Sequence, residues 1–239
     1  MMPGREKRVL SLDGLRGLGA LMVFLYHVDI MVKPFGAGGP SLFPGTASVM
    51  VFFILSGIVL SLVPFKHMGN GGYDWLGYYP RRVVRLCVPL FAAIALALPA
   101  GYVAWRLGST SRSALAVAYD AGLPTAVHDI LMQFDVLFAA CLVVVVVAIA
   151  DGFTRRALSA APMVFLGKVS YSLYLTHAIV IGALAALLPR LGIVDPLAIA
   201  AVSLPASMLV SVAFWRIIEV PSMNLSRSLA SSGPRDAVR

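Results

Sequence analysis

Six long apolar stretches dominate the chain, and short segments between them hold most of the polar and charged residues. A helix needs about 20 mainly apolar residues to cross the hydrocarbon core of a bilayer. The fourth stretch is the shortest, but Pro124 can begin a helix that lengthens it. The pattern predicts an all-α, polytopic bundle of about six transmembrane helices, with apolar stretches at residues 15–32, 47–65, 83–105, 136–150, 169–188 and 196–218.

The helix expected around the first stretch, which begins at Leu12, carries three ionisable side chains on one face: Asp13, Arg16 and His27. Eleven steps of 100° bring His27 to within about 20° of Arg16, about 16 Å further along the helix, and Asp13 lies within about 40° of that line. Such groups cost about 2.5 to 3.5 kcal/mol each at the bilayer centre, so they normally face a protein interior or a wet cavity. We therefore expect other helices to cover this face.

Composition and charge place the chain in a membrane. Hydrophobic residues make up 59% of the 239 residues and charged residues only 13%, which is not the composition of a soluble domain. The net charge of +8 indicates orientation rather than a nucleic-acid partner. If the spans alternate from a cytoplasmic N-terminus, most of the 19 Lys and Arg residues fall inside. This favours an N-in, C-in protein of a bacterial inner or plasma membrane, in contact with lipid.

Two segments frame the expected domain organisation. Residues 1–225 are predicted to form a single transmembrane domain. Residues 226–239 are rich in Ser, Gly and basic side chains without an apolar pattern, so a disordered cytoplasmic tail is expected there. No metal-ligand cluster and no glycine-rich phosphate loop appears in the sequence, so neither a metal nor a bound cofactor is expected.

Four short motifs point to one family. In chain order they resemble the signatures of the acyltransferase 3 family of integral membrane O-acyltransferases. A departure lies between them, because residues 106–133 replace several further spans of that family, so the chain resembles a shortened member. The motifs are Leu12-Asp-Gly-Leu-Arg16-Gly with Tyr26-His27, Phe52-Phe-Ile-Leu-Ser56-Gly, Leu166-Gly-Lys-Val-Ser170-Tyr-Ser-Leu-Tyr174-Leu-Thr-His177, and Glu219-Val-Pro221.

The resemblance implies a catalytic set on the first helix. Acyl transfer to a hydroxyl needs a general base and a positive group near the developing oxyanion. His27 is the expected base, and Arg16, too distant to touch the same atoms, is expected to grip the donor while Asp13 holds its side chain. Arg82 and Arg85 correspond to family arginines and are expected to bind the nucleotide end of acyl-CoA by forked hydrogen bonds. Alternatively, they only mark the cytoplasmic flank of a span.

A secondary polar site accompanies this set. Ser170, Tyr174 and His177 follow one another at i, i+4 and i+7, so they form a second polar stripe that can face the first. Ser56 and Glu219 complete the group. Structural alternatives stay open: Ser56 can serve close helix packing, His177 a hydrogen bond between helices, and Glu219 the neutralisation of an arginine.

The function implied by the resemblance is that of an enzyme. It would transfer an acyl group, expected to be acetyl, from cytoplasmic acyl-CoA to a hydroxyl of an extracytoplasmic glycan, lipid or small molecule. Six helices enclose such a site incompletely, so a homo-oligomer that covers the polar side chains is an open expectation. The shortened middle leaves an inactive or partner-dependent relative as the alternative, and a small transporter is less favoured, although intramembrane His, Arg and Asp also line ion paths.

Overall fold

A computed structural model of the chain is helical throughout the parts that it describes. No strand occurs among these residues, which confirms the predicted all-α class. Most of the expected span at 47–65, nearly all of the one at 136–150, and the whole of segment 107–133 lie outside the described part. The structure describes residues 10–34, 42–43, 45, 47–51, 54–55, 75–106, 141 and 153–231.

Four of the described helical stretches are long and apolar enough to cross a membrane, which supports the polytopic fold. They span Leu10–Val32, Pro80–Val103, Ala161–Leu191 and Pro196–Ser228. The elements are α1 (Leu10–Val32), α3 (Trp75–Arg106), α6 (Phe153–Leu158), α7 (Ala161–Leu187), the 3-10 turn η1 (Leu188–Leu191), α8 (Pro196–Phe214), the π-helical turn η2 (Trp215–Glu219) and α9 (Val220–Ser231).

Local sequence signals explain where α7 ends and α8 begins. Gly192 follows η1 with a φ of 86°, a backbone conformation that glycine adopts without steric cost. Pro196 then opens α8 at a position where its missing N–H is not needed. The side chain of Asp195 caps this start by accepting a hydrogen bond of 3.1 Å from the Leu197 N–H. The chain thus turns back on itself within a few residues.

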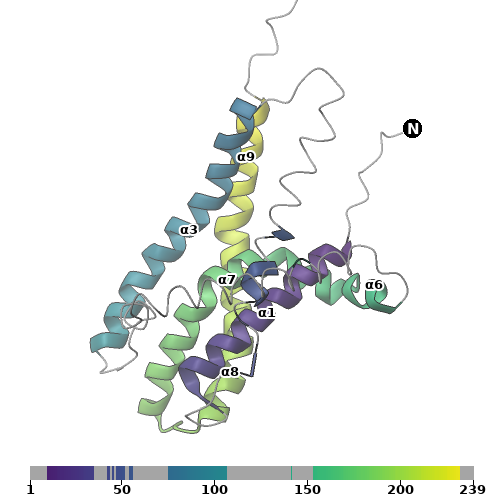
Figure 1. The fold of residues 1–239 in the computed structure, drawn as a ribbon. Coiled ribbons are helices and arrows are strands. Elements are labelled where there is room, and N and C mark those ends of the chain that lie inside the picture. Colours follow the sequence, from purple (N-terminus) through teal and green to yellow (C-terminus); the bar gives the residue numbers. More distant parts are fainter. Residues whose placement is uncertain are drawn as a thin grey trace, which may run out of the picture.

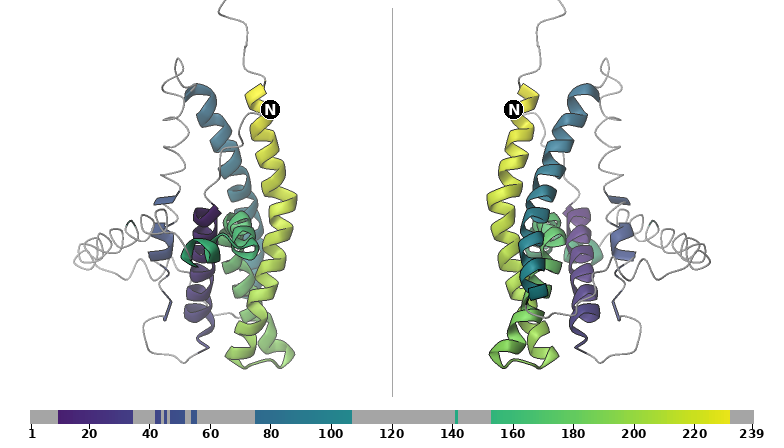
Figure 2. Two further views of the ribbon diagram at one scale, coloured as in Figure 1. Left: turned by 90° about the vertical axis from the view of Figure 1, so that its right-hand side faces the viewer. Right: turned by 90° about the vertical axis from the view of Figure 1, so that its left-hand side faces the viewer.

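The directions of the helices agree with the predicted alternation. α1, α3 and α7 run the same way, and the continuous α8–η2–α9 rod runs the opposite way (Figure 1). This is the pattern expected for the first, third, fifth and sixth of six alternating spans. α3 and α9 lie side by side and extend beyond the level at which α1 begins (Figure 2). Which end faces the cytoplasm stays a prediction.

The most extensive contact between described helices joins α1 to α7, and glycines make it close. A Cβ on Gly17 would lie 2.7 Å from the Gly167 backbone nitrogen, and a Cβ on Gly167 would overlap the Asp13 carbonyl oxygen. Two helix backbones therefore touch without intervening side chains, as small residues allow in membrane bundles. Buried apolar residues line the contact further along, among them Ala20, Val169 and Leu173.

The end of the expected membrane domain differs from the prediction. α9 extends to Ser231, so residues 226–231, expected as the start of the tail, are helical. The Ser226 hydroxyl donates a hydrogen bond of 2.7 Å to the Arg81 carbonyl oxygen, which ties α9 to α3. A contact with another helix therefore stabilises a segment that has no apolar pattern of its own. Residues 232–239 lie outside the described part.

The close α1–α7 contact yields a stability prediction. Gly167→Ala places a methyl group against the backbone of α1, and because backbone atoms cannot rotate away, we expect a loss of about 1 to 3 kcal/mol in the free energy of unfolding. Gly101→Ala is the matched control, because a Cβ there meets nothing within 4 Å and alanine favours the helix. Thermal unfolding in detergent measures both. A Gly167→Ala protein as stable as wild type would contradict the packing.

Candidate active site

Two histidines from different helices meet inside the bundle. The ring centroids of His27 on α1 and His177 on α7 lie 4.8 Å apart, with an interplanar angle of 74°. Further aromatic rings lie beside the pair. The ring centroid of Tyr26 is 5.3 Å from that of His27, and the centroids of Tyr174 and Phe24 are 6.1 Å and 6.5 Å from that of His177. The structure therefore brings together one residue from each of the two polar stripes that the sequence predicts.

Both imidazoles are oriented in the same way by their own helices. The Nδ1 atom of His27 lies 2.8 Å from the Val23 carbonyl oxygen, and that of His177 lies 2.8 Å from the Leu173 carbonyl oxygen. A carbonyl oxygen can only accept, so each Nδ1 carries the hydrogen, and Nε2 is the acceptor of the neutral ring. Each ring thus has a basic nitrogen available for a substrate proton.

The Nε2 atom of His177 is the more informative of the two acceptors, because it is buried. His177 is only 4% exposed, and its Nε2 atom has no hydrogen-bond partner among the described residues. A buried polar atom without a partner costs about 1 to 3 kcal/mol, and such atoms occur at functional sites. The position of His177 beside the less deeply buried His27 is therefore suited to receiving a hydroxyl group.

A second polar cluster lies nearer the start of α1. The Ser172 hydroxyl on α7 donates a hydrogen bond of 2.5 Å to Oε2 of Glu219 on η2. The neighbouring Tyr171 donates one of 2.8 Å to the Leu86 carbonyl oxygen on α3. The positive charges of Arg85 and Arg16 act on the Glu219 carboxyl group. Four segments, α1, α3, α7 and η2, thus converge on one buried acid.

The two clusters occupy different depths of the bundle. Arg16 and His27 are separated by about 16 Å of helical rise on α1, and Ser172 and His177 by about 7.5 Å on α7. The arginines therefore cannot act on the atoms that the histidines reach. A substrate that used both clusters would have to be an elongated molecule with a charged end.

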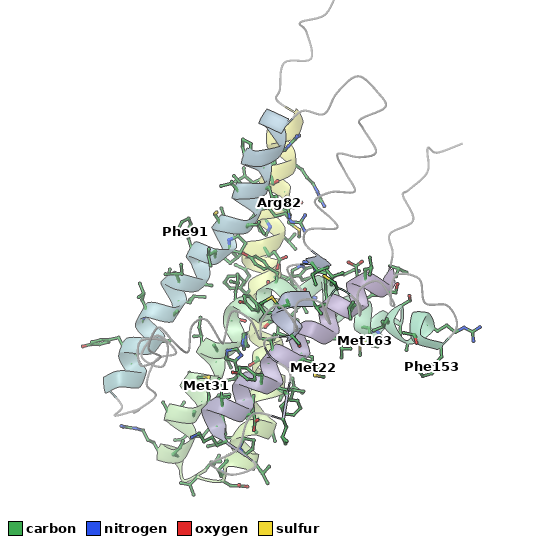
Figure 3. The ribbon with its side chains drawn as sticks, viewed as in Figure 1. Met22, Met31, Arg82, Phe91, Phe153 and Met163 are labelled. Atoms are coloured by element: carbon green, nitrogen blue, oxygen red, sulfur yellow. The ribbon has the colours of Figure 1, made fainter. Side chains whose placement is uncertain are left out.

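The other expected site residues have simpler positions. Asp13 is buried where its backbone packs on α7. The Ser170 hydroxyl donates to the Gly167 carbonyl oxygen of its own helix at 2.8 Å, so it stabilises α7 locally. Arg82 lies on the upper part of α3, whereas Phe91, further along, points away from the bundle (Figure 3). Ser56 lies outside the described residues.

One buried network was not predicted. The Thr176 hydroxyl lies 3.1 Å from that of Ser211 on α8 and donates a hydrogen bond of 2.9 Å to the Ser172 carbonyl oxygen. The sequence contains one pattern that indicates this network: Ser203, Ser207 and Ser211 follow at intervals of four residues, which puts all three on one face of α8. These serines are fully buried, and Ser211 joins α8 to α7 through Thr176.

Comparison with known proteins decides the family. A family model described as an acyltransferase domain matches residues 9–128, half of the chain. The chain belongs to the acyltransferase 3 family. Neither the curated proteins nor the solved structures gave a match. The matched range contains the predicted site residues of α1 and α3, whereas α7 and Glu219 lie beyond it.

Membership of the acyltransferase 3 family and the four apolar helices together make this an integral membrane protein with an acyltransferase domain. The family model covers His27 but not His177. The contact between the two rings is therefore a property that the structure adds to the match. It joins a residue of the matched half of the chain to a residue of the second half.

The different burial of the two histidines gives a labelling prediction. Diethyl pyrocarbonate modifies accessible neutral imidazole nitrogens, so in the folded protein we expect His27, which is only partly buried, to react well before His177. Mass spectrometry of peptides after a short exposure measures the two yields. The control is the unfolded protein, in which both should react at similar rates. Equal rates in the folded protein would contradict the burial of His177.

Proposed function

We propose that this acyltransferase 3 protein transfers an acyl group, acetyl in the first instance, from cytoplasmic acyl-CoA to a hydroxyl of an extracytoplasmic glycan or lipid. The observation that carries the proposal is the contact between His27 and His177 in the bundle interior. Two imidazoles whose Nδ1 atoms face backbone carbonyl oxygens can use their Nε2 atoms to remove a proton from a hydroxyl. Arg16 on α1 and Arg85 on α3 lie at a different depth, which we call the arginine level, whereas His27 and His177 form the histidine level. The arginine level is proposed to hold the charged end of the donor.

In the proposed reaction His27 acts as the general base. Its Nε2 atom takes the proton of the acceptor hydroxyl while the hydroxyl oxygen attacks the thioester carbonyl. The C–O bond forms, the C–S bond breaks, and the thiolate of CoA leaves with the proton that His27 returns. This step is a direct transfer; transfer through an acyl intermediate on the protein is the alternative route to the same products. His177, whose Nε2 atom has no partner among the described residues, is proposed to orient the acceptor by accepting a hydrogen bond from a second donor group of that molecule.

The donor is proposed to enter from the arginine level. Acyl-CoA carries phosphates at one end and its thioester at the other, so it is an elongated substrate with a charged end. Arg82 and Arg85 on α3 and Arg16 on α1 are proposed to hold the phosphates by charge-assisted hydrogen bonds. Asp13, one turn from Arg16, is proposed to hold the side chain of that arginine. The thioester then reaches along the bundle toward His27.

Release of CoA by the purified protein in lipid, with acetyl-CoA and a panel of hydroxylated glycans, tests the reaction. His27→Ala should lower acceptor-dependent release about 100-fold or more, because it removes the base. Asp29→Asn is the control on the same helix, since Asn can still accept the hydrogen bond from the Leu42 N–H. A His27→Ala protein with the wild-type rate would refute the proposed base.

The same assay separates the alternatives. If the wild-type protein folds but releases no CoA with any acceptor, an inactive or partner-dependent relative is supported, and adding a full-length acyltransferase should then change the activity of that partner. Solute movement across liposomes without acyl-CoA consumption would instead support a transporter.

The donor site yields a separate kinetic prediction. Arg82→Ala and Arg85→Ala should each raise KM for acyl-CoA about tenfold while changing kcat little, because a hydrogen bond to a charged group contributes about 1.5 to 3 kcal/mol. Arg190→Ala is the matched control, since Arg190 lies in η1 at the opposite end of the bundle. If Arg190→Ala raised KM equally, net charge rather than a donor site would explain the effect.

A further inference from the structure

Glu219 is a buried acid in an unusual backbone position. It is only 5% exposed, and it ends the π-helical turn η2, where the Val220 N–H bonds to the Trp215 carbonyl oxygen five residues back. In a regular α-helix the ring of Pro221 would clash with the Ile217 carbonyl oxygen, so a proline here favours a local departure from α geometry. Such π turns occur frequently at functional sites.

A buried carboxylate must be compensated, and one neutral hydroxyl is not enough. Removing a carboxylate from water costs several kcal/mol unless charged or hydrogen-bonding partners replace the water. Ser172 supplies one short hydrogen bond. The positive charges of Arg85 and Arg16 also act on this carboxyl group. Glu219 therefore depends on two arginines that belong to two other helices.

Backbone contacts independently place both arginines at this level. Leu86, adjacent to Arg85, accepts a hydrogen bond from Tyr171, the residue before Ser172. Gly17, adjacent to Arg16, lies against the backbone of α7 at Gly167. The α1 and α3 segments that carry the two arginines are thus attached to the stretch of α7 between residues 167 and 172.

We infer that Glu219 is a positioning residue for donor binding: held by Ser172, its carboxylate keeps Arg16 and Arg85 together so that both can bind phosphate groups of an acyl-CoA. Two guanidinium groups repel each other, and a fixed anion between them offsets this repulsion. The inference rests on the proposed function, because it assigns the buried acid to the same donor site. Glu219 does not touch the reacting atoms, which lie at the histidine level.

Equilibrium binding of CoA to the full-length protein in lipid nanodiscs tests the inference. Wild-type protein should bind CoA, and Glu219→Gln, which keeps shape but removes charge, should weaken binding about tenfold. Ser172→Ala should weaken binding in the same direction, because the carboxylate loses its anchor. Ser203→Ala is the matched control: Ser203 is a fully buried serine that donates to the Ile199 carbonyl oxygen, far along α8 from Glu219.

Kinetics and unfolding distinguish positioning from a purely structural role. Glu219→Gln should raise KM for acyl-CoA by the same factor as the dissociation constant of CoA, with KM for the acceptor unchanged. A variant with a lowered Tm but wild-type affinity for CoA, or with tighter binding, would overturn the inference. If Glu219→Gln shows no cooperative unfolding, the CoA affinity of Ser172→Ala is the deciding measurement. An unchanged CoA affinity in Ser172→Ala then overturns the inference.

Wild-type binding separates this inference from the proposed function. If wild-type protein does not bind CoA, the proposed donor is wrong and the inference fails with it. If wild-type protein binds CoA and the Glu219 and Ser172 variants bind equally well, only the role of Glu219 is wrong.

Discussion

The site depends on the direct backbone contact between α1 and α7. Glycines at 17 and 167 let the two helices approach until backbone atoms meet. In a membrane, where apolar side chains gain little by leaving lipid, such close van der Waals packing is a main source of helix association. It also sets the register between the helices, and with it the neighbours of every polar group on α1. The ring contact between His27 and His177 follows from that register.

Polar groups on the described helices are sorted into two levels with different chemistry. The histidine level is aromatic, and its imidazoles are oriented by carbonyl groups one turn earlier in their own helices. The arginine level is charged and is organised around Glu219. A chain of buried hydroxyls on α7 and α8, including Thr176 and Ser211, links the two helices between these levels. Satisfied hydroxyls of this kind keep helices together in lipid without placing a charge there.

The described helices differ in how much of their surface is covered. α1 and α7 hold most of the buried residues, whereas α3 exposes a series of large apolar side chains, Phe91 and Leu98 among them. An apolar outer surface is expected for a helix in contact with lipid. α3 nevertheless contributes to the site, because its hydrogen bonds from Tyr171 and Ser226 fix the turns that carry Arg85 and Arg81. Although α3 exposes much of its apolar surface, the end that carries Arg81 and Arg85 is thus attached to α7 and α9.

The sequence alone determined the helical class, the membrane setting and the polar face of α1, because apolar length and angular position are properties of one helix. It also identified His27, His177 and Glu219 as candidates by their motifs. Only the tertiary structure decided which residues meet. The pairing of the histidines, the Ser172–Glu219 hydrogen bond and the extension of α9 to Ser231 each depend on contacts between distant segments. Helical periodicity says which side of a helix a residue occupies, but the neighbour on that side is set by how closely two backbones can approach.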